Sequence, residues 1–208
     1  MFKSDCGAKI MENRKSEIIK ILKQNGINLK FVEKEFRDDI DVNLTAVKEN
    51  LCALQYVDSS LSKNEEFIYR GITETSWALF IYKFASKKIR NNEKILIEAL
   101  KRDGEAIAFA NKEFSERKDL ARIALNARRN ANLQHFSDKV RGDREFMLEV
   151  LKDYTHQLLY LTPDLKSDID FMSKVVEANP SIEKYISKDL AKAIKNNLQL
   201  QSDKEIAD

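Results

Sequence analysis

The sequence predicts an all-α protein, a solenoid-like array of about seven helical-hairpin repeats, each about 25 residues long. Hydrophobic residues make up 43% of the 208 residues and charged residues 34%, a balance typical of a chain that folds around a core. Five glycines and two prolines are too few for the many tight turns of a β-sandwich or barrel. Apolar residues also recur at a nearly constant interval, which is typical of stacked helical repeats.

One apolar residue, here called the anchor, returns every 25 to 28 residues, with a ring side chain five residues before it and a polar residue three residues before it. Because a polar oxygen there can accept a hydrogen bond from a free backbone N–H, each anchor is expected in the first turn of a short capped helix. The anchors are Phe36, Leu61, Ile89, Phe114, Val140, Leu165 and Leu190; the rings are Phe31, Tyr56, Phe84, Phe109, His135, Tyr160 and Tyr185; the capping positions are Glu33, Asp58, Ser86, Asn111, Ser137, Thr162 and Ser187. Pro163 follows Thr162, at the first helical position, where the N–H that proline lacks is not needed.

A longer helix is expected to start just after each anchor turn. An Asp or Asn stands three residues before an apolar residue, and carboxylates follow in the first turn, where the helix dipole favours negative charge. Apolar residues then recur at offsets of four and five, which places one apolar stripe on a helix of about three turns. The predicted starts are Asp39, Asn64, Asn92, Asp143 and Asp168, and the middle stripe positions are Ile21, Ala46, Gly71, Ala99, Ala124, Val150 and Val175. Four of these seven are Ala or Gly, which lets a neighbouring helix approach closely.

Polar links such as QNG, RDG and ANP are expected to end these helices. Gly26 and Gly104 are predicted as left-handed C-caps, and Pro180 cannot continue a helix. Each repeat is therefore expected to contain a helix, a turn, a second helix with the ring, and a capped turn with the anchor. The predicted organisation is an N-terminal extension (residues 1–16), seven tandem repeats as one continuous domain (17–190), and a C-terminal helix with a frayed tail (191–208).

The stretches LTAVKENLCALQYVDSSLSKN (residues 44–64), IEALKRDGEAIAFANKEF (97–114) and LEVLKDYTHQLLYLTPDLKSD (148–168) resemble the tandem helical repeats of the bacterial domain of unknown function 4116 family. The resemblance implies an all-helical repeat fold and, in several bacteria, occurrence in effector or scaffold proteins. It implies no reaction, cofactor or catalytic residue. Two repeats depart from the common pattern: the third has three extra residues within Trp77–Phe84, and the fifth has one extra residue and His135 as its ring.

Residue patterns predict no enzyme, no cofactor and no metal site. His135 and His156, the only histidines, stand in no metal-binding motif, and we expect His135 to be a partly buried packing residue and His156 a surface residue. No glycine-rich phosphate loop or nucleophile elbow is present. The Asp pairs 38/39 and 168/170 lack the glycine and distal glutamate of a calcium loop, and their recurrence with the repeat indicates helix caps.

Two uneven features locate the candidate contact region. Trp77 and the apolar residues after it either widen the core or leave a groove for a partner helix. From Lys83 to Arg144 there are 16 Lys and Arg against 9 Asp and Glu, although the whole chain has a net charge of only +2. The candidate partner-binding residues are Trp77, Tyr82, Arg122, Arg128, Arg129 and Arg141.

These observations predict a non-enzymatic protein–protein interaction or scaffold module with an unidentified protein partner. The family resemblance implies that it is part of an effector-type bacterial protein. The alternative is binding of nucleic acid or another polyanion through the basic middle repeats. The two cysteines, Cys6 and Cys52, and the lack of a long apolar run predict a cytoplasmic protein without a membrane segment. For an effector-type protein, as the resemblance implies, delivery to a host cell would follow a leaderless route.

Overall fold

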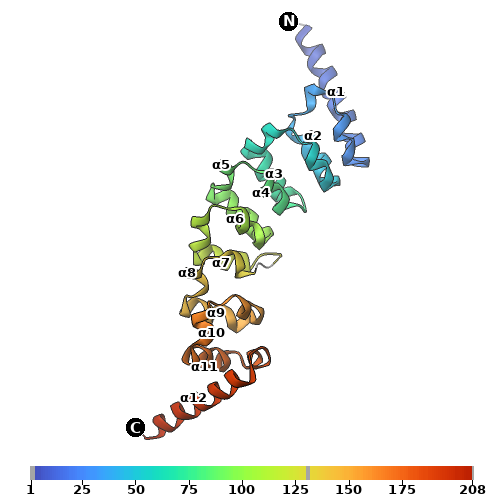
Figure 1. Ribbon diagram of the computed structural model, residues 1–208. Coiled ribbons are helices and arrows are strands. Elements are labelled where there is room, and N and C mark those ends of the chain that lie inside the picture. Colours follow the sequence, from blue (N-terminus) through green and yellow to red (C-terminus); the bar gives the residue numbers. More distant parts are fainter. Residues whose placement is uncertain (1–2, 130–131, 208) are drawn as a thin grey trace. The chain divides into compact units, whose positions relative to one another are not determined.

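The computed structural model describes residues 3–129 and 132–207, and within these ranges the chain is all-α and contains no β-strand (Figure 1). The predicted all-α class is thereby confirmed. Contacts divide the chain into two compact units, called unit 1 (Met1–Asn111 and Asn126–Asn130) and unit 2 (Lys112–Leu125 and Ala131–Asp208). None of the helices in the described ranges has the length and hydropathy that crossing a membrane requires.

The predicted longer helices begin where the sequence places them. Side-chain oxygens of Asp39, Asn64, Asp143 and Asp168 accept hydrogen bonds from the backbone N–H three residues on, at 2.8–3.0 Å, and Asn92 accepts from the N–H two residues on. These bonds satisfy backbone donors that the first helical turn leaves free. The helices are α2 (Ile40–Glu49), α3 (Glu65–Glu74), α6 (Glu93–Arg102), α9 (Arg144–Asp153) and α11 (Ile169–Ala178), with the shorter α7 (Lys118–Leu125) between α6 and α9.

The two outermost helices are longer. α1 (Lys3–Gln24) runs without a break through residue 16, the predicted end of the N-terminal extension. α12 (Lys188–Ala207) likewise joins the last anchor turn to the C-terminal segment in one helix.

The segment that carries the ring, predicted as the second helix of each repeat, is a 3₁₀ helix at six places in the described chain. Its N-cap is typically Asn or Asp: Asn50 Oδ1 accepts from Cys52 N at 2.8 Å, and Asn25, Asp103 and Asn179 make the same bond to the N–H two residues on. That bond closes a tight turn at the start of the segment. These segments are η1 (Gly26–Phe31), η3 (Leu51–Tyr56), η5 (Gly104–Phe109), η7 (Leu133–His135), η8 (Thr155–Tyr160) and η9 (Pro180–Tyr185).

The predicted left-handed glycine caps are wrong, because no glycine in the described chain has a positive φ. Gly26 is instead the first residue of η1, and a Cβ added there would lie 2.1 Å from the backbone oxygen of Ala46. Glycine is therefore needed at position 26 because two backbones approach closely. Gly104 begins η5 and donates its N–H to Arg129 O at 3.0 Å.

The anchors lie in short turns, as predicted. Phe36, Leu61, Ile89, Val140 and Leu165 are buried, whereas the anchors at 114 and 190 are half-buried. The turns are η2 (Lys34–Phe36), η4 (Ser59–Lys63), α5 (Lys87–Arg90), η6 (Lys112–Glu116), α8 (Asp138–Arg141) and α10 (Pro163–Ser167), and the last begins at Pro163. The predicted side-chain caps form at Asp58, Ser86 and Ser187 but not at Ser137 and Thr162. Glu33, the one residue of the series that is not a typical N-cap, makes no capping bond either.

The third repeat accommodates its three extra residues by changing helix type. In place of a 3₁₀ segment it has α4 (Ala78–Phe84), and Thr75, Ser76 and Trp77 connect α4 to α3, where a single residue connects α2 to η3. Seven α-helical residues extend about 10.5 Å, and six 3₁₀ residues extend about 12 Å. The added residues therefore leave the length of this segment nearly unchanged.

In unit 1, α1 packs on α2, α2 on α3 and α3 on α6. Lys15 Nζ of α1 lies 2.9 Å from Asp39 and 2.8 Å from Asp41, at the start of α2, and Lys48 Nζ near the end of α2 lies 2.6 Å from Glu74 at the end of α3. Because the bonds join like positions of successive helices, neighbouring helices run parallel.

Unit 2 repeats this arrangement, with α11 packed on both α9 and α12. Lys118 Nζ of α7 lies 2.7 Å from Asp143 Oδ2, at the start of α9. The buried Gln157 accepts a hydrogen bond from Leu133 N through its Oε1, at 2.9 Å, so a side chain of η8 satisfies a backbone donor of η7.

The rings line an accessible surface in each unit. Phe31, Tyr56 and Tyr185 are exposed, and Phe84, Phe109 and Tyr160 are half-buried. His135 is also exposed, which corrects the expectation of a partly buried packing residue, because the ring position faces solvent here as it does at Phe31, Tyr56 and Tyr185. His156 is exposed, as predicted.

Candidate functional site

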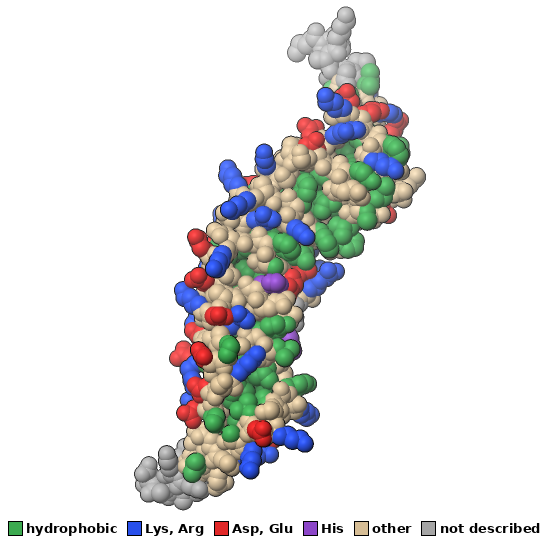
Figure 2. Space-filling view, in the orientation of Figure 1, with side chains coloured by type: hydrophobic (Ala, Val, Ile, Leu, Met, Phe, Trp, Pro, Cys, Tyr) green, Lys and Arg blue, Asp and Glu red, His purple; other side chains and the backbone are tan. Residues whose placement is uncertain are grey.

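The six predicted contact residues are divided between the two units. Trp77, Tyr82, Arg128 and Arg129 belong to unit 1, and Arg122 and Arg141 to unit 2. Figure 2 shows Lys and Arg side chains distributed along the visible face among Asp and Glu side chains. The basic middle of the sequence therefore has to be considered one unit at a time.

Tyr82 is a core residue, which corrects its prediction as a contact residue. Its side chain is fully buried, and its hydroxyl donates a hydrogen bond to Arg90 O at 2.8 Å. Burial raises the pKa of the Tyr82 phenol. In α4, therefore, Tyr82 faces the core, whereas Phe80 is exposed.

The arginines of unit 2 hold neighbouring elements together. The Arg122 guanidinium lies over the Phe146 ring, 5.1 Å from its centroid, and 2.5 Å from Glu149, so it joins α7 to α9. Arg141 bonds Asp138 at 2.5 Å and donates to Tyr160 O at 3.5 Å. Both side chains are used in packing within unit 2.

Arg128 and Arg129 line a pocket of about 320 Å³ in unit 1, which we call the arginine pocket. Thr75 and Ser76 contribute hydroxyls after the end of α3, and Arg102 contributes a third guanidinium from the end of α6. The remaining lining residues are Glu74, Ala78 and Asp103.

Backbone hydrogen bonds hold the two loop arginines at this place. Arg128 N donates to Lys101 O at 3.3 Å, and Gly104 N donates to Arg129 O at 3.0 Å. The loop is therefore fixed at the C-terminal end of α6, where the helix dipole stabilises positive charge. Both arginine side chains remain exposed.

The other walls of the pocket are rigid. Thr75 is buried, and its hydroxyl donates to Gly71 O at 2.7 Å and accepts from Trp77 N at 3.0 Å. Arg102 Nη2 donates to Thr73 O at 2.5 Å. These bonds place the pocket on the ends of two packed helices.

Positive charge predominates in the arginine pocket. Its two carboxylates already have partners: Glu74 lies 2.9 Å from Arg70 and 2.6 Å from Lys48, which lower the pKa of Glu74, and Asp103 caps η5. Arg129, whose side chain is 64% exposed, is 3.8 Å from Asp103. The three guanidinium groups therefore favour an anionic ligand, which each could bind through two parallel hydrogen bonds.

Trp77 stands beside this pocket, between the lining residues Ser76 and Ala78. It occupies the N-cap position of α4 and is half-buried. Its indole Nε1 is buried and has no hydrogen-bond partner within the described structure. Trp77 thus supports the wall of the arginine pocket, and only part of it is accessible.

Sequence reasoning missed Arg102 and Thr75. Arg102 precedes the capping residue Asp103 in the RDG link, the place where each longer helix ends. A search for charged residues at helix ends would have found it. Thr75 gives no comparable signal.

No group of three or more His, Cys, Asp and Glu side chains that could hold a metal ion occurs in the part of the chain the structure describes. The aspartates considered as metal ligands have other roles: Asp39 caps α2 and bonds Lys15, and Asp168 caps α11 and bonds Arg144, which lowers the pKa of Asp168.

The sequence profile described as a domain of unknown function (DUF4116) matches residues 16–62, 64–115 and 143–191, more than half of the chain. The chain belongs to this family. Each DUF4116 copy spans two longer helices or parts of them, the second copy containing α3 and α6 and the third α9 and α11. A comparison with curated proteins and one with solved structures each found no significant match.

The arginine pocket combines matched and unmatched parts of the chain. Thr75, Ser76, Arg102 and Asp103 lie in the second DUF4116 copy, whereas Arg128 and Arg129 lie between the second and third copies.

Proposed function

We propose that this DUF4116 protein is a non-enzymatic protein–protein interaction module, a solenoid-like array of seven helical-hairpin repeats that binds an acidic segment of a partner protein. Side-chain bonds between like positions 24 to 29 residues apart support the array, because each repeat is joined to its neighbours in sequence. Stacked repeats of this kind bury their apolar stripes against one another and offer an extended surface to partners.

The arginine pocket is the observation that carries the proposal. Three arginines and Ser76 line this space of about 320 Å³, and the carboxylates that also line it already have partners. Carboxylate side chains of a partner would complete this arrangement, because guanidinium and carboxylate match in both charge and geometry. Trp77 is half-buried and Phe80 is exposed, and both lie close in sequence to the pocket residues. Their rings would add apolar contact with the partner.

A charge-reversal experiment tests this placement. Arg128→Glu/Arg129→Glu changes the pocket, and Lys87→Glu/Lys88→Glu, on two adjacent exposed residues of α5, is the matched control with the same change in net charge. Both proteins would be titrated into a fluorescent glutamate-rich peptide and used as bait for quantitative affinity purification.

We expect the pocket variant to lose the peptide and the specific partner, with affinity reduced about tenfold or more for two lost charge-assisted contacts, while the control retains both. Equal binding by the pocket variant and the wild type would contradict the proposal. Equal losses in both variants would show that only net charge matters.

Binding of nucleic acid or another polyanion is the second candidate, favoured by the excess of 16 basic over 9 acidic residues between Lys83 and Arg144. Titration of labelled single-stranded RNA at two salt concentrations separates the two functions. Phosphate contacts release counterions and weaken steeply with salt. A steep salt dependence that both charge-reversal variants reduce would favour the polyanion.

We place this activity in the cytoplasm, either of the producing bacterium or, for an effector-type protein, of a host cell. Two cysteines in the whole chain, with Cys52 unpaired and exposed, suit a reducing compartment. Fractionation of producing and infected cells, followed by immunoblotting, tests the location.

A further inference from the structure

α1 carries an exposed stripe of four side chains, Ile10, Arg14, Glu17 and Ile21, which we call the α1 stripe. The spacings of four, three and four residues place all of them on one side of the helix. Ile10 is 61% exposed and Ile21 51%, and the Arg14 and Glu17 side chains are similarly accessible. Two large apolar residues therefore flank two opposite charges on an uncovered helix face.

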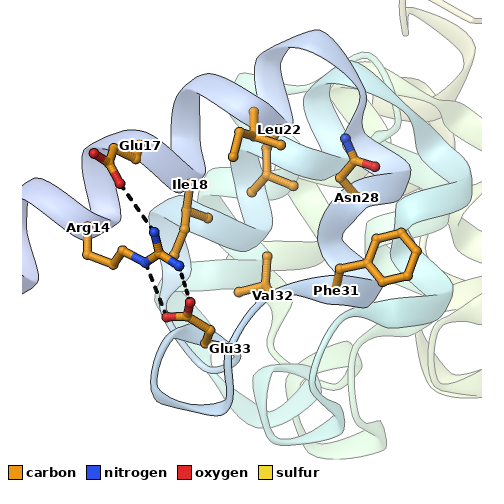
Figure 3. Close-up of a pocket in the computed structure, with 9 residues that line it drawn as sticks. Arg14, Glu17, Ile18, Leu22, Asn28, Phe31, Val32 and Glu33 are labelled. Carbon is orange, nitrogen blue, oxygen red and sulfur yellow. Dashed lines mark hydrogen bonds and ion pairs between the residues drawn. The ribbon is translucent and has the colours of Figure 1, made fainter.

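The stripe borders a groove of about 340 Å³ between α1 and η1 (Figure 3). Ile18, Ile21, Leu22 and Val32 give the groove apolar walls, and the Phe31 ring at its side is 73% exposed. Figure 3 shows Arg14 between Glu17 and Glu33 at one end of the groove. The groove is thus apolar along most of its length and charged at one end.

The corresponding face is buried in the following helices of unit 1. The position that is Glu17 in α1 is Val42 in α2, and the position that is Ile21 is Ala46, and both α2 residues are fully buried. α2 has α1 on one side and α3 on the other. Helices of this protein therefore use this face for packing, and α1 leaves it open.

The α1 stripe is complementary to itself. Ile10 and Ile21 are placed symmetrically about a point between Lys15 and Ser16, and so are Arg14 and Glu17. When two copies of α1 lie antiparallel about that point, Ile10 meets Ile21 of the partner subunit and Arg14 meets Glu17 of the partner subunit. A two-fold axis then produces every contact twice, as in an isologous dimer.

We propose that two copies of this protein associate through antiparallel pairing of their α1 stripes. Ile10 of the partner subunit enters the groove beside Ile21 and Phe31, and covers apolar surface that is open in one copy. Arg14 keeps its bond to Glu33 in its own chain, since a guanidinium group has five N–H donors, and also bonds Glu17 of the partner subunit. A pairing of one helix per copy gives a weak dimer whose population depends on concentration.

Sedimentation velocity and light scattering over a wide range of concentration test the dimer. We expect the wild type to dimerise as its concentration rises and Ile21→Asp to remain monomeric, because the carboxylate would be buried in the interface. Arg14→Glu places like charges opposite each other on both sides of the two-fold axis and should weaken dimerisation about tenfold. Lys23→Glu, on an exposed residue of α1 outside the stripe, is the matched control and should dimerise as the wild type does.

The decisive variant is the charge swap Arg14→Glu/Glu17→Arg, which restores opposite charges across the two-fold axis and should restore dimerisation. Far-UV circular dichroism checks that each variant keeps its helix content. A wild type that stays monomeric at every concentration, or a charge swap that remains as weak as Arg14→Glu, would overturn the proposal. Dimerisation that persists in Ile21→Asp would place the interface elsewhere.

Discussion

Corresponding positions of α1 and α9 have opposite environments. Phe146 and Val150 of α9 are buried, with the Arg122 guanidinium over the Phe146 ring, whereas the corresponding residues of α1, Glu17 and Ile21, are exposed. The two helices have the same place in the repeat, so the difference arises from what covers them. A position in this fold is therefore a core position only where a neighbouring helix supplies the other half of the contact.

Among the variants that test this comparison, Phe146→Ala should lower the free energy of unfolding the most. Removal of a buried aromatic ring leaves a cavity and should lower the free energy of unfolding by about 3–5 kcal/mol. Glu17→Ala, at the corresponding exposed position, should change the stability by no more than about 0.5 kcal/mol. Urea unfolding followed by far-UV circular dichroism measures both, and similar losses in the two variants would show that the two environments do not differ as described.

Gly26→Ala tests the close approach between the first two repeats. A Cβ at residue 26 would lie 2.1 Å from Ala46 O and 3.0 Å from Ala46 C, both backbone atoms, so the chain must move. We expect a loss of about 1–3 kcal/mol in the free energy of unfolding, or more if the backbone resists.

The fluorescence of Trp77 can follow this unfolding transition, because Trp77 is the only tryptophan and lies in unit 1. The control is Lys23→Ala, at an exposed residue in the last turn of α1. An unchanged transition in Gly26→Ala would mean that η1 and α2 are not packed so closely.

Asp143→Asn should cause the smallest loss of stability, and that loss should depend on pH. The residue at the corresponding position of α1 is Arg14, in the middle of a helix, whereas Asp143 caps α9 and bonds Lys118, which lowers the pKa of the Asp143 carboxyl. The pKa of Asp143 is lower in the folded state than in the unfolded state. The ion pair therefore contributes its full stability above about pH 4, the ordinary pKa range of aspartate, and this stability is lost as the pH falls through the folded pKa.

Asparagine keeps the capping oxygen and removes the charge. The variant should therefore be less stable than the wild type at neutral pH by at most about 1 kcal/mol, and the difference should shrink in acid. Urea midpoints measured between neutral and acidic pH check this, and a difference that did not change with pH would assign the effect to the cap alone.

The longer helices could be predicted because their signals are local. An Asp or Asn three residues before an apolar residue fixes a helix start whatever surrounds it, and the caps at Asn64 and Asp168 form as expected. The ring segments could not be assigned in the same way. An Asn that bonds the N–H two residues on and one that bonds the N–H three residues on look alike in sequence, so the 3₁₀ helix after Asn50 was indistinguishable from a short α-helix.

The candidate site was only partly predictable. Arg128, Arg129 and the Trp77 region were identified from charge and aromatic clustering, and the structure places both arginines in a pocket beside Trp77. Arg102 could not be assigned to the same site, because only the fold brings the ends of α3 and α6 together. The sequence could not show that Tyr82 is buried while Phe80 is exposed, because that depends on which side of α4 faces the core.

The short reach of the bonds between repeats has a consequence for unfolding. Bonds such as Lys118 to Asp143 and Asn197 to Asp170 connect residues only about 25 positions apart, so one repeat can lose its structure without removing contacts from distant ones. Melting can then proceed in stages from an end, with partly folded forms present at intermediate temperatures. A single melting temperature would describe such a chain less well than hydrogen exchange measured segment by segment.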